Sequence, residues 1–257
     1  MIGQIKLITL ITDFGKSYYV GEMKGAIKKV DPEAEIIDIT HSIHRYNVAE
    51  GAFVLSRVWR HFPKNTVHLI VIDPGVGSPR KAIGLQTDYT FLIGPDNGVL
   101  RWAIRDQKVM RAVELDPLRV QESAGLSLLS ATFHGRDLFA PAAALLTKGV
   151  DLDMLGKRVE DIAKLDLRED TVVHVDGFGN IVTTVGTEIK PGTTVMVAHG
   201  TKTYGAKAVR TFSDAKPGEL IVLTGSHGLL EVDINQGSAA ELLGAESGDP
   251  IGVEYVG

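Results

Sequence analysis

Strand-like and helix-like patterns alternate along the first 150 residues, and this alternation limits the folds available to the chain. Residues 67–73 (VHLIVID) form a near-continuous apolar run, which is typical of a strand buried on both faces. β-rich runs at 5–12 and 35–40 precede it, and helical spacing of apolar residues covers 20–30 and 47–62. Strands that alternate with helices favour parallel pairing. The pattern therefore predicts an open, mostly parallel α/β sheet with helices on both faces.

Two more strands and two more helices complete this first predicted domain. Residues 82–87 and 90–93 are β-rich and are separated by a short polar link at Asp88, which predicts a strand pair. Residues 97–105 and 136–146 have helical spacing. We expect the domain to span residues 1–160.

After about residue 170 the pattern changes to short β-rich runs punctuated by Gly and Pro. Strands at this spacing predict a small barrel or sandwich, and only residues 238–243 look helical. We expect a smaller all-β barrel domain over residues 168–257, with the boundary inside the charged stretch at 149–168. The β-rich runs are 171–175, 181–185, 193–199, 206–211, 219–224, 229–234 and 251–256.

Composition excludes several classes of function. Lys and Arg number 27 against 32 Asp and Glu, a net charge of −5, which argues against a nucleic-acid partner. The chain has no cysteine, so disulfides, thiolate zinc sites, iron–sulfur clusters and cysteine nucleophiles are excluded. No apolar run reaches the roughly 18 residues that a membrane span needs. The N-terminal pattern does not resemble a signal peptide, and we expect a cytoplasmic protein with no membrane partner.

Two carboxylates follow predicted strands of the first domain. Asp13 follows the first strand, and Asp73 closes the buried run before a Pro-Gly-Val-Gly loop. Ligands of open α/β sheets bind beyond the carboxyl ends of the strands, where a carboxylate can accept hydrogen bonds from ribose hydroxyls. Each carboxylate could instead cap a turn or a helix. Arg80 could fold back onto Asp73 and keep it ionised, or it could be a surface arginine of the loop.

One histidine has an unusual context. His134 lies between an aromatic residue and a glycine, at the start of a charged helical pattern. A histidine can exchange protons near neutral pH, although this one could equally cap the helix. His41 and His44 have the spacing of half a metal site, but no third ligand is nearby, and we interpret them as structural.

In the predicted β domain, residues 176–180 (DGFGN) form a polar, glycine-rich turn between two strands. This turn could present Asp176, Phe178 and Asn180 to a heterocycle, or it could be an ordinary hairpin turn. The segment at Ser226 has the same ambiguity. The chain lacks the Rossmann glycine pattern, the Walker A motif and the His-Glu-x-x-His signature. These absences mean that the sequence gives no sign of a dinucleotide or of ATP hydrolysis. We predict no metal and no cofactor for this chain.

Taken together, six short motifs in this order resemble the S-adenosyl-L-methionine (SAM) hydroxide adenosyltransferases, which are water-using relatives of the bacterial fluorinase and chlorinase. Each motif alone is weak, but their combination and order are specific, and the resemblance covers the whole chain. It implies an N-terminal α/β domain, a C-terminal β-barrel and a homotrimer with sites shared between subunits. The motifs lie at residues 12–15 (TDFG), 40–43 (THSI), 73–80 (DPGVGSPR), 94–98 (GPDNG), 132–137 (TFHGRD) and 176–180 (DGFGN).

The resemblance also implies roles for individual residues. Asp73, Arg80 and His134 match a set that positions and activates water. Asp13 matches the carboxylate that holds the ribose hydroxyls. The other matches to substrate-binding positions are Tyr46 and Phe133 for the nucleoside pocket, Phe178 and Asn180 for adenine, and Asp176 and Ser226 for the amino-acid part of methionine.

Three positions depart from the halogenase pattern. The halogenases have a tyrosine where Asp73 stands, a serine at Gly135 and an arginine at His227. The first two departures argue against halogenation, and the third leaves His227 without an assigned role.

The predicted reaction is attack of water or hydroxide on the ribose 5′ carbon of SAM, which gives adenosine and methionine. His134 is the candidate proton acceptor, or it only positions hydroxide that is already formed. Two alternatives remain open. One is a metal-dependent nucleotide hydrolase, whose site would be built from Asp13, His41, Asp73, His134 and Asp176. The other is a nucleoside-binding sensor without turnover.

Overall fold

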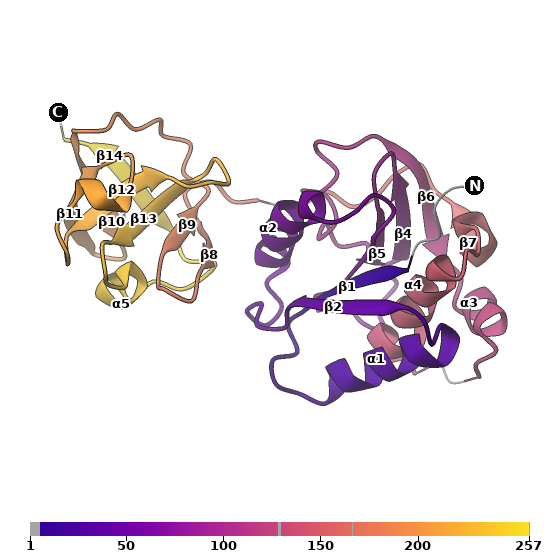
Figure 1. The fold of residues 1–257 in the computed structure, drawn as a ribbon. Helices are drawn as coiled ribbons and strands as arrows, with labels where there is room; N and C mark the ends of the chain where they lie inside the picture. The colour runs from indigo at the N-terminus through magenta and orange to yellow at the C-terminus, as the bar shows by residue number, and fades with distance from the viewer. Residues whose placement is uncertain (1–5, 128–129, 166, 257) are drawn as a thin grey trace. The chain divides into compact units, whose positions relative to one another are not determined.

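A computed structural model describes residues 6–127, 130–165 and 167–256. The chain divides into two compact units, residues 1–166 and 167–257, and each contains a seven-stranded sheet (Figure 1). No helix in the described residues is both long and apolar enough to cross a membrane. Each unit is described by itself.

The sheet of the first unit is mixed, so the prediction of a mostly parallel sheet was wrong. β1 pairs in parallel with β2 and β3, and β3 with β5, whereas β4, β6 and β7 are joined to the sheet by antiparallel pairs. Only a few residues link β4 to β5, and such a link permits a hairpin but no parallel crossover. The strands are, in sheet order, β2 (Glu35–Thr40), β1 (Leu7–Thr12), β3 (Val67–Val71), β5 (Phe91–Pro95), β4 (Ala82–Thr87), β6 (Val109–Leu115) and β7 (Gly156–Arg158).

Helices cover both faces of this sheet, because side chains on a strand alternate between its faces. Leu10 of β1 belongs to a core shared with α1 and α4, and Ile11 belongs to a second core shared with α2. The helices are α1 (Tyr19–Val30), α2 (Val48–Val58), α3 (Pro117–Ala124) and α4 (Ala140–Thr147), and a π-helical turn, Gly135–Phe139, leads directly into α4.

The predicted helix at residues 97–105 is instead a series of turns. The side chain of Asn97 donates to the carbonyl of Ile72 at 2.9 Å and accepts from the N–H of Val99 at 3.2 Å. These bonds tie the start of the segment to the end of β3 in place of a helical ladder, because an Asn side chain competes with the backbone for its hydrogen bonds.

The second unit is a mixed sheet that curls as a half-barrel. All its strand pairs are antiparallel except β11–β12, and an isolated bridge joins Thr171 to Pro250 beside the two outermost strands. The strands are, in sheet order, β14 (Ile251–Tyr255), β10 (Thr194–His199), β11 (Lys202–Ala208), β12 (Leu220–Thr224), β13 (Leu230–Ile234), β9 (Ile181–Thr183) and β8 (Val172–Val175), with one helix, α5 (Ala239–Leu243).

Candidate active site

A cavity of about 630 Å³ lies beyond the carboxyl ends of β1 and β3. This is the edge of an α/β sheet at which ligands bind, because the connections there are free to vary. Five residues that the sequence singles out line it: Asp13, Tyr46, Asp73, Phe133 and His134.

Arg80 joins Asp73 to His134. Its Nε donates to Oδ1 of Asp73 at 2.9 Å, and its Nη2 donates to Oδ2 of Asp73 and to Nδ1 of His134, the latter at 2.8 Å. The Arg80 and Asp73 side chains are only 10% and 6% exposed. Charge-assisted, bidentate bonds with little exposure hold the three groups in one arrangement.

The loop between Asp73 and Arg80 depends on glycine. Gly77 has φ +79°, which an L side chain rarely adopts, and a Cβ there would lie 2.9 Å from the carbonyl oxygen of Ala131. Only glycine therefore lets this loop approach the segment that carries His134.

The bond from Arg80 decides the tautomer of His134. A guanidinium has no acceptor, so Nδ1 of His134 must accept and the ring proton must lie on Nε2. Burial, and then the positive charge of Arg80, lower the pKa of His134 below its usual value. His134 is thus a neutral imidazole with one N–H left to donate. It has no free lone pair with which to take a proton from water unless Arg80 moves.

Phe139 packs against the side chains of Arg80 and His134. It is fully buried, and the Arg80 guanidinium lies 5.3 Å from its ring centre. The His134 ring meets Phe139 edge-on at 6.5 Å between ring centres. Packing on one buried ring restricts both side chains.

The carboxylate of Asp13 is oriented by the backbone of Tyr46, whose N–H donates to Oδ2 at 2.9 Å. Tyr46 has φ +66° and an exposed side chain. The buried carboxylate of Glu50 accepts from both the N–H and Nδ1 of His44 and so fixes the preceding turn. Burial is the main cause that raises the pKa of Asp13, and the nearby charge of Asp73 raises it further.

The same cavity has an aromatic surface, of which the sequence motifs indicated only Phe133. The rings of Phe14, Tyr19 and Phe133 meet one another edge-on, with centres 5.1–5.8 Å apart, and Tyr18 lies against Tyr19 at 4.6 Å. Glu22 and Arg136 also line the cavity. The sequence held one sign that these residues belong to the site, which is their closeness along the chain to predicted site residues: Phe14 follows Asp13, and Arg136 lies two residues after His134.

In the second unit, Asp176 organises its own turn. Its Oδ1 accepts from the N–H of Phe178 at 2.8 Å and of Asn180 at 3.0 Å, and its Oδ2 accepts from Nδ2 of Asn180 at 3.0 Å. Phe178 is 82% exposed. The predicted residues 176, 178 and 180 therefore share one turn that presents an aromatic ring.

The predicted residue Ser226 is also exposed, whereas the side chain of His227, the next residue, is mostly buried. Nδ1 of His227 accepts from the N–H of Leu229 at 3.1 Å, so Nε2 carries the proton and donates to Glu231 at 2.7 Å. His227 is thus bonded within its own unit.

Comparison with known proteins assigns both units to one family. Residues 8–156 match the N-terminal domain of the SAM hydroxide adenosyltransferases, and residues 170–252 match their C-terminal domain. The chain belongs to the SAM hydroxide adenosyltransferase family.

Relatives of this family member are similar over nearly their whole length. The chain is 36% identical to a protein of Methanocaldococcus jannaschii named (R)-S-adenosyl-L-methionine hydrolase, with 98% of this chain and 97% of that protein covered. It is 24% identical to a fluorinase of Nocardia brasiliensis over 93% of each. A crystal structure described as an uncharacterized conserved protein from Thermotoga maritima is 37% identical, with a TM-score of 0.85, 96% of this chain and 99% of that chain covered.

The histidines that suggested a metal have other partners in this family member. Nδ1 of His41 bonds the Thr12 hydroxyl at 2.9 Å and its Nε2 lies 3.2 Å from Asp38, while His44 bonds Glu50. In the part of the chain that the structure describes, no three His, Asp or Glu side chains are grouped as a metal would require.

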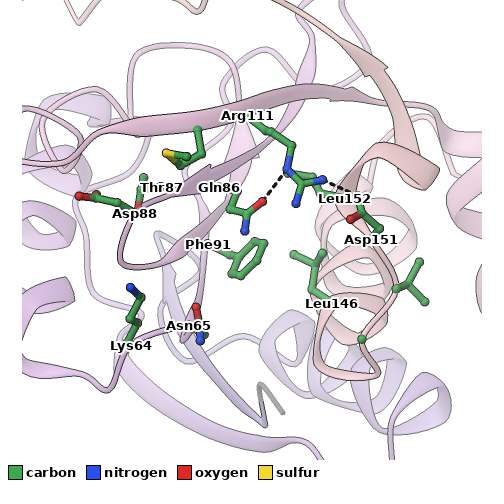
Figure 2. A pocket seen from close by; sticks show the side chains of 13 residues that line it. Lys64, Asn65, Gln86, Thr87, Asp88, Phe91, Arg111, Leu146, Asp151 and Leu152 are labelled. Atoms are coloured by element: carbon green, nitrogen blue, oxygen red, sulfur yellow. Dashed lines mark hydrogen bonds and ion pairs between the residues drawn. The ribbon is translucent and has the colours of Figure 1, made fainter. Parts of the chain in front are cut away.

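A second cavity, of about 600 Å³, lies at the other edge of the same sheet, where β3 and β5 begin (Figure 2). Figure 2 shows Arg111 bonded to Gln86 and Asp151, at 2.7 and 2.6 Å, above the ring of Phe91. None of the residues matched to the family's site lines this cavity. The candidate chemistry of the first unit therefore belongs to the first cavity.

Proposed function

We propose that this chain hydrolyses SAM. Oxygen from water or hydroxide forms a bond to the ribose 5′ carbon, the bond from that carbon to sulfur breaks, and its electron pair stays on sulfur. The products are adenosine and methionine, and the proton of an attacking water goes to solvent. The observation that carries the proposal is that Asp13, Asp73 and His134 line one cavity, with Arg80 bonded to both Asp73 and His134, in a chain whose residues 8–156 and 170–252 match the family.

The site residues act mainly by holding an anionic nucleophile. The bond from Arg80 leaves Nε2–H as the one N–H of the His134 ring, and a donor favours the charged form of an oxygen bound to it. Asp73 keeps Arg80 in place. Because sulfonium is a good leaving group, orientation of the nucleophile is the main task, and orientation can contribute about 7–11 kcal/mol in favourable cases.

The remaining roles follow from the resemblance. Asp13 holds the ribose hydroxyls, Tyr46 and Phe133 line the nucleoside pocket, and the reaction uses no metal or cofactor. In the second unit, Phe178 and Asn180 contact adenine, and Asp176 and Ser226 hold the methionine part. The Thr171–Pro250 bridge supports a sheet that closes into a barrel. We also propose a homotrimer in which each site takes residues from two subunits.

The direct test is chromatography of SAM incubated with the protein in heavy-oxygen water, with both sulfonium epimers assayed separately. We expect adenosine that carries one heavy oxygen, and methionine in equal amount. Loss of activity with a chelator and rescue by a divalent cation would favour a metal-dependent hydrolase instead. Saturable adenosine binding with unchanged SAM would identify a sensor.

A further inference from the structure

Arg136 and Asp137 form a second bidentate aspartate–arginine pair beside the active-site cavity. Nε of Arg136 donates to Oδ1 of Asp137 at 2.6 Å, and Nη2 donates to Oδ2 at 3.0 Å. Cζ of Arg136 lies over the ring of Phe133, 5.1 Å from its centre. We propose that Arg136, held by Asp137, is a positioning residue that fixes the Phe133 ring for binding of the nucleoside. This inference rests on the proposed function, in which Phe133 lines the nucleoside pocket.

Asp137 is anchored independently of Arg136. Its side chain is 3% exposed, and its Oδ2 also accepts from the N–H of Ser130 at 2.7 Å, which closes the segment between the two residues. The carbonyl of Asp137 accepts from Nε2 of the buried Gln121 on α3. Asp137 is therefore a fixed point, and its bidentate bond sets the plane of the Arg136 guanidinium.

The Phe133 ring is packed on several sides. A Cβ at Gly135 would lie 3.1 Å from Cε2 of Phe133, so the ring lies directly against the backbone of the π-helical turn. The rings of Phe14 and Tyr19 meet it edge-on, with centres 5.8 and 5.1 Å away. The guanidinium of Arg136 adds the attraction between a cation and an aromatic ring, which is lost if the ring turns away.

The position of Arg136 separates its role from that of the reacting groups. It lines the cavity, its side chain is 23% exposed, and its Nη1 donates to Glu22 of α1 at 3.2 Å. The bonds to Asp137 and Glu22 raise its pKa, so it stays cationic. Among the described residues, none of its hydrogen bonds reaches His134. Its effect should therefore appear in nucleoside binding and not in the attack on the 5′ carbon.

Loss of the guanidinium should weaken nucleoside binding without lowering the fraction of chains that bind. Calorimetric titration of the full chain with adenosine measures both quantities. For Arg136→Ala we expect adenosine to bind roughly five- to tenfold more weakly at unchanged stoichiometry. The kcat for SAM should stay nearly unchanged, because the lost interaction is one of uniform binding. A merely structural defect would instead lower the stoichiometry and leave the affinity as it was.

Free guanidinium should restore the lost affinity, because the vacated place opens on the cavity and the Asp137 carboxylate remains to hold the ion. Millimolar guanidinium chloride should bring Arg136→Ala back toward the affinity of the unmodified chain. Methylammonium chloride at the same ionic strength should not, because an ammonium lacks the planar fork. Arg136→Lys should recover little of the affinity for the same reason.

Arg60→Ala is the matched control. Arg60 also donates to an aspartate, Asp106 at 2.8 Å, and lies over an aromatic ring, that of Trp59, but it lies outside the cavity. Its replacement should leave adenosine affinity unchanged. If Arg136→Ala does not fold, Arg136→Met combined with Asp137→Asn removes both charges together, and the same loss of affinity is expected.

Three results would overturn the inference. They are unchanged adenosine affinity without the guanidinium, an equal loss in Arg60→Ala, and a loss in Arg136→Ala that guanidinium restores no better than methylammonium. Hydrolysis of SAM by the unmodified chain is measured separately. A chain that binds adenosine as expected but releases none from SAM would refute the proposed function and leave the role of Arg136 in place.

Discussion

At the scale of single residues, the site differs from the usual picture of a catalytic histidine. The accepting nitrogen of His134 is occupied by Arg80, and burial lowers its pKa. A general base needs a free lone pair in reach of its proton. The arrangement instead leaves the Nε2–H of His134 as a donor, which fits the proposed role of holding hydroxide.

If His134 acts as a donor, a side-chain amide should replace it in part. We expect His134→Ala to lower kcat by about 10²–10³-fold, the usual cost of one lost donor to an anion. His134→Gln, which keeps an N–H, should recover at least about tenfold of that loss. Single-turnover kinetics with SAM would measure both, with adenosine affinity as the check on folding. If both variants were equally inactive and still bound adenosine, the result would support His134 as a general base instead.

Asp13 should impose a pH dependence on nucleoside binding. Its folded pKa is raised above 3.8 by burial, so the carboxylate takes up a proton earlier on acidification than an exposed aspartate does. Adenosine affinity should therefore fall as the pH drops through this raised pKa. Asp13→Asn should bind about tenfold more weakly at neutral pH and show a flat profile over the same range. Fluorescence or calorimetric titration from pH 4 to 7 would measure both. A flat profile in the unmodified protein would show that Asp13 does not contact the nucleoside.

At the scale of elements, β13 carries a residue that conflicts with its surroundings. Leu230 and Val232 point into the core of the second unit, while Glu231 and Asp233 face the other side of the strand. Asp233 is fully buried, and within the described residues neither of its oxygens has a hydrogen-bond partner. Burial, and then the charges of Glu231 and Asp176, raise its pKa to about 8. A buried acid without a partner costs stability.

Replacing Asp233 should therefore stabilise the protein, increasingly so at higher pH. The folded state holds the proton of Asp233 up to about pH 8, whereas the unfolded chain releases it near 3.8. Between these values the folded state binds more protons, so its stability falls as the pH rises. We expect Asp233→Val to raise the free energy of unfolding by roughly 2 kcal/mol or more at pH 8 and by less at pH 5.

Thermal or urea unfolding at several pH values would measure this difference. Glu254→Val is the matched control for loss of a carboxylate, since Glu254 is exposed on β14 of the same unit. A gain from Asp233→Val that is the same at pH 5 and pH 8 would show that Asp233 is ionised in the folded state.

At the scale of the whole molecule, the chain is two units with separate cores. The core of the second unit contains only residues of that unit, such as Val197 and Val232, and the two cores of the first unit flank its own sheet. The predicted water-handling residues lie in the first unit and the predicted adenine-binding turn in the second. The proposed roles therefore imply that activity requires both units, from one subunit or from two.

Subunit mixing distinguishes these cases. His134→Ala and Asn180→Ala chains, each inactive alone, are denatured together and refolded as a mixture. If each site takes its two units from different subunits of a closed cyclic oligomer, some sites receive two intact units and activity partly returns. If one chain supplies both units, every site keeps one defect. Adenosine formation by the mixture, compared with each refolded parent, is the measurement, and no recovery would contradict the shared site.

The sequence by itself determined what depends on local pattern. The spacing of apolar residues and the length of each run identified β1, β2, β3 and the two helices that flank β2 in the sequence. Asp13 and Asp73 follow the ends of strands, and this position placed them at one edge of the sheet. The ordered motifs were enough to assign the family. These signals lie within a few residues of each other, where side-chain direction follows directly from the backbone.

Only the tertiary structure decided what depends on contacts distant along the chain. The strand β6 was not predicted from the sequence, and several of its side chains are exposed. It joins the sheet by antiparallel pairing with β4. The tautomer of His134 is set by Arg80, 54 residues away, and the Glu22–Arg136 pair joins residues 114 apart. The physical reason is that a hydrogen bond depends on distance in space, and separation along the sequence does not report that distance until the chain has folded.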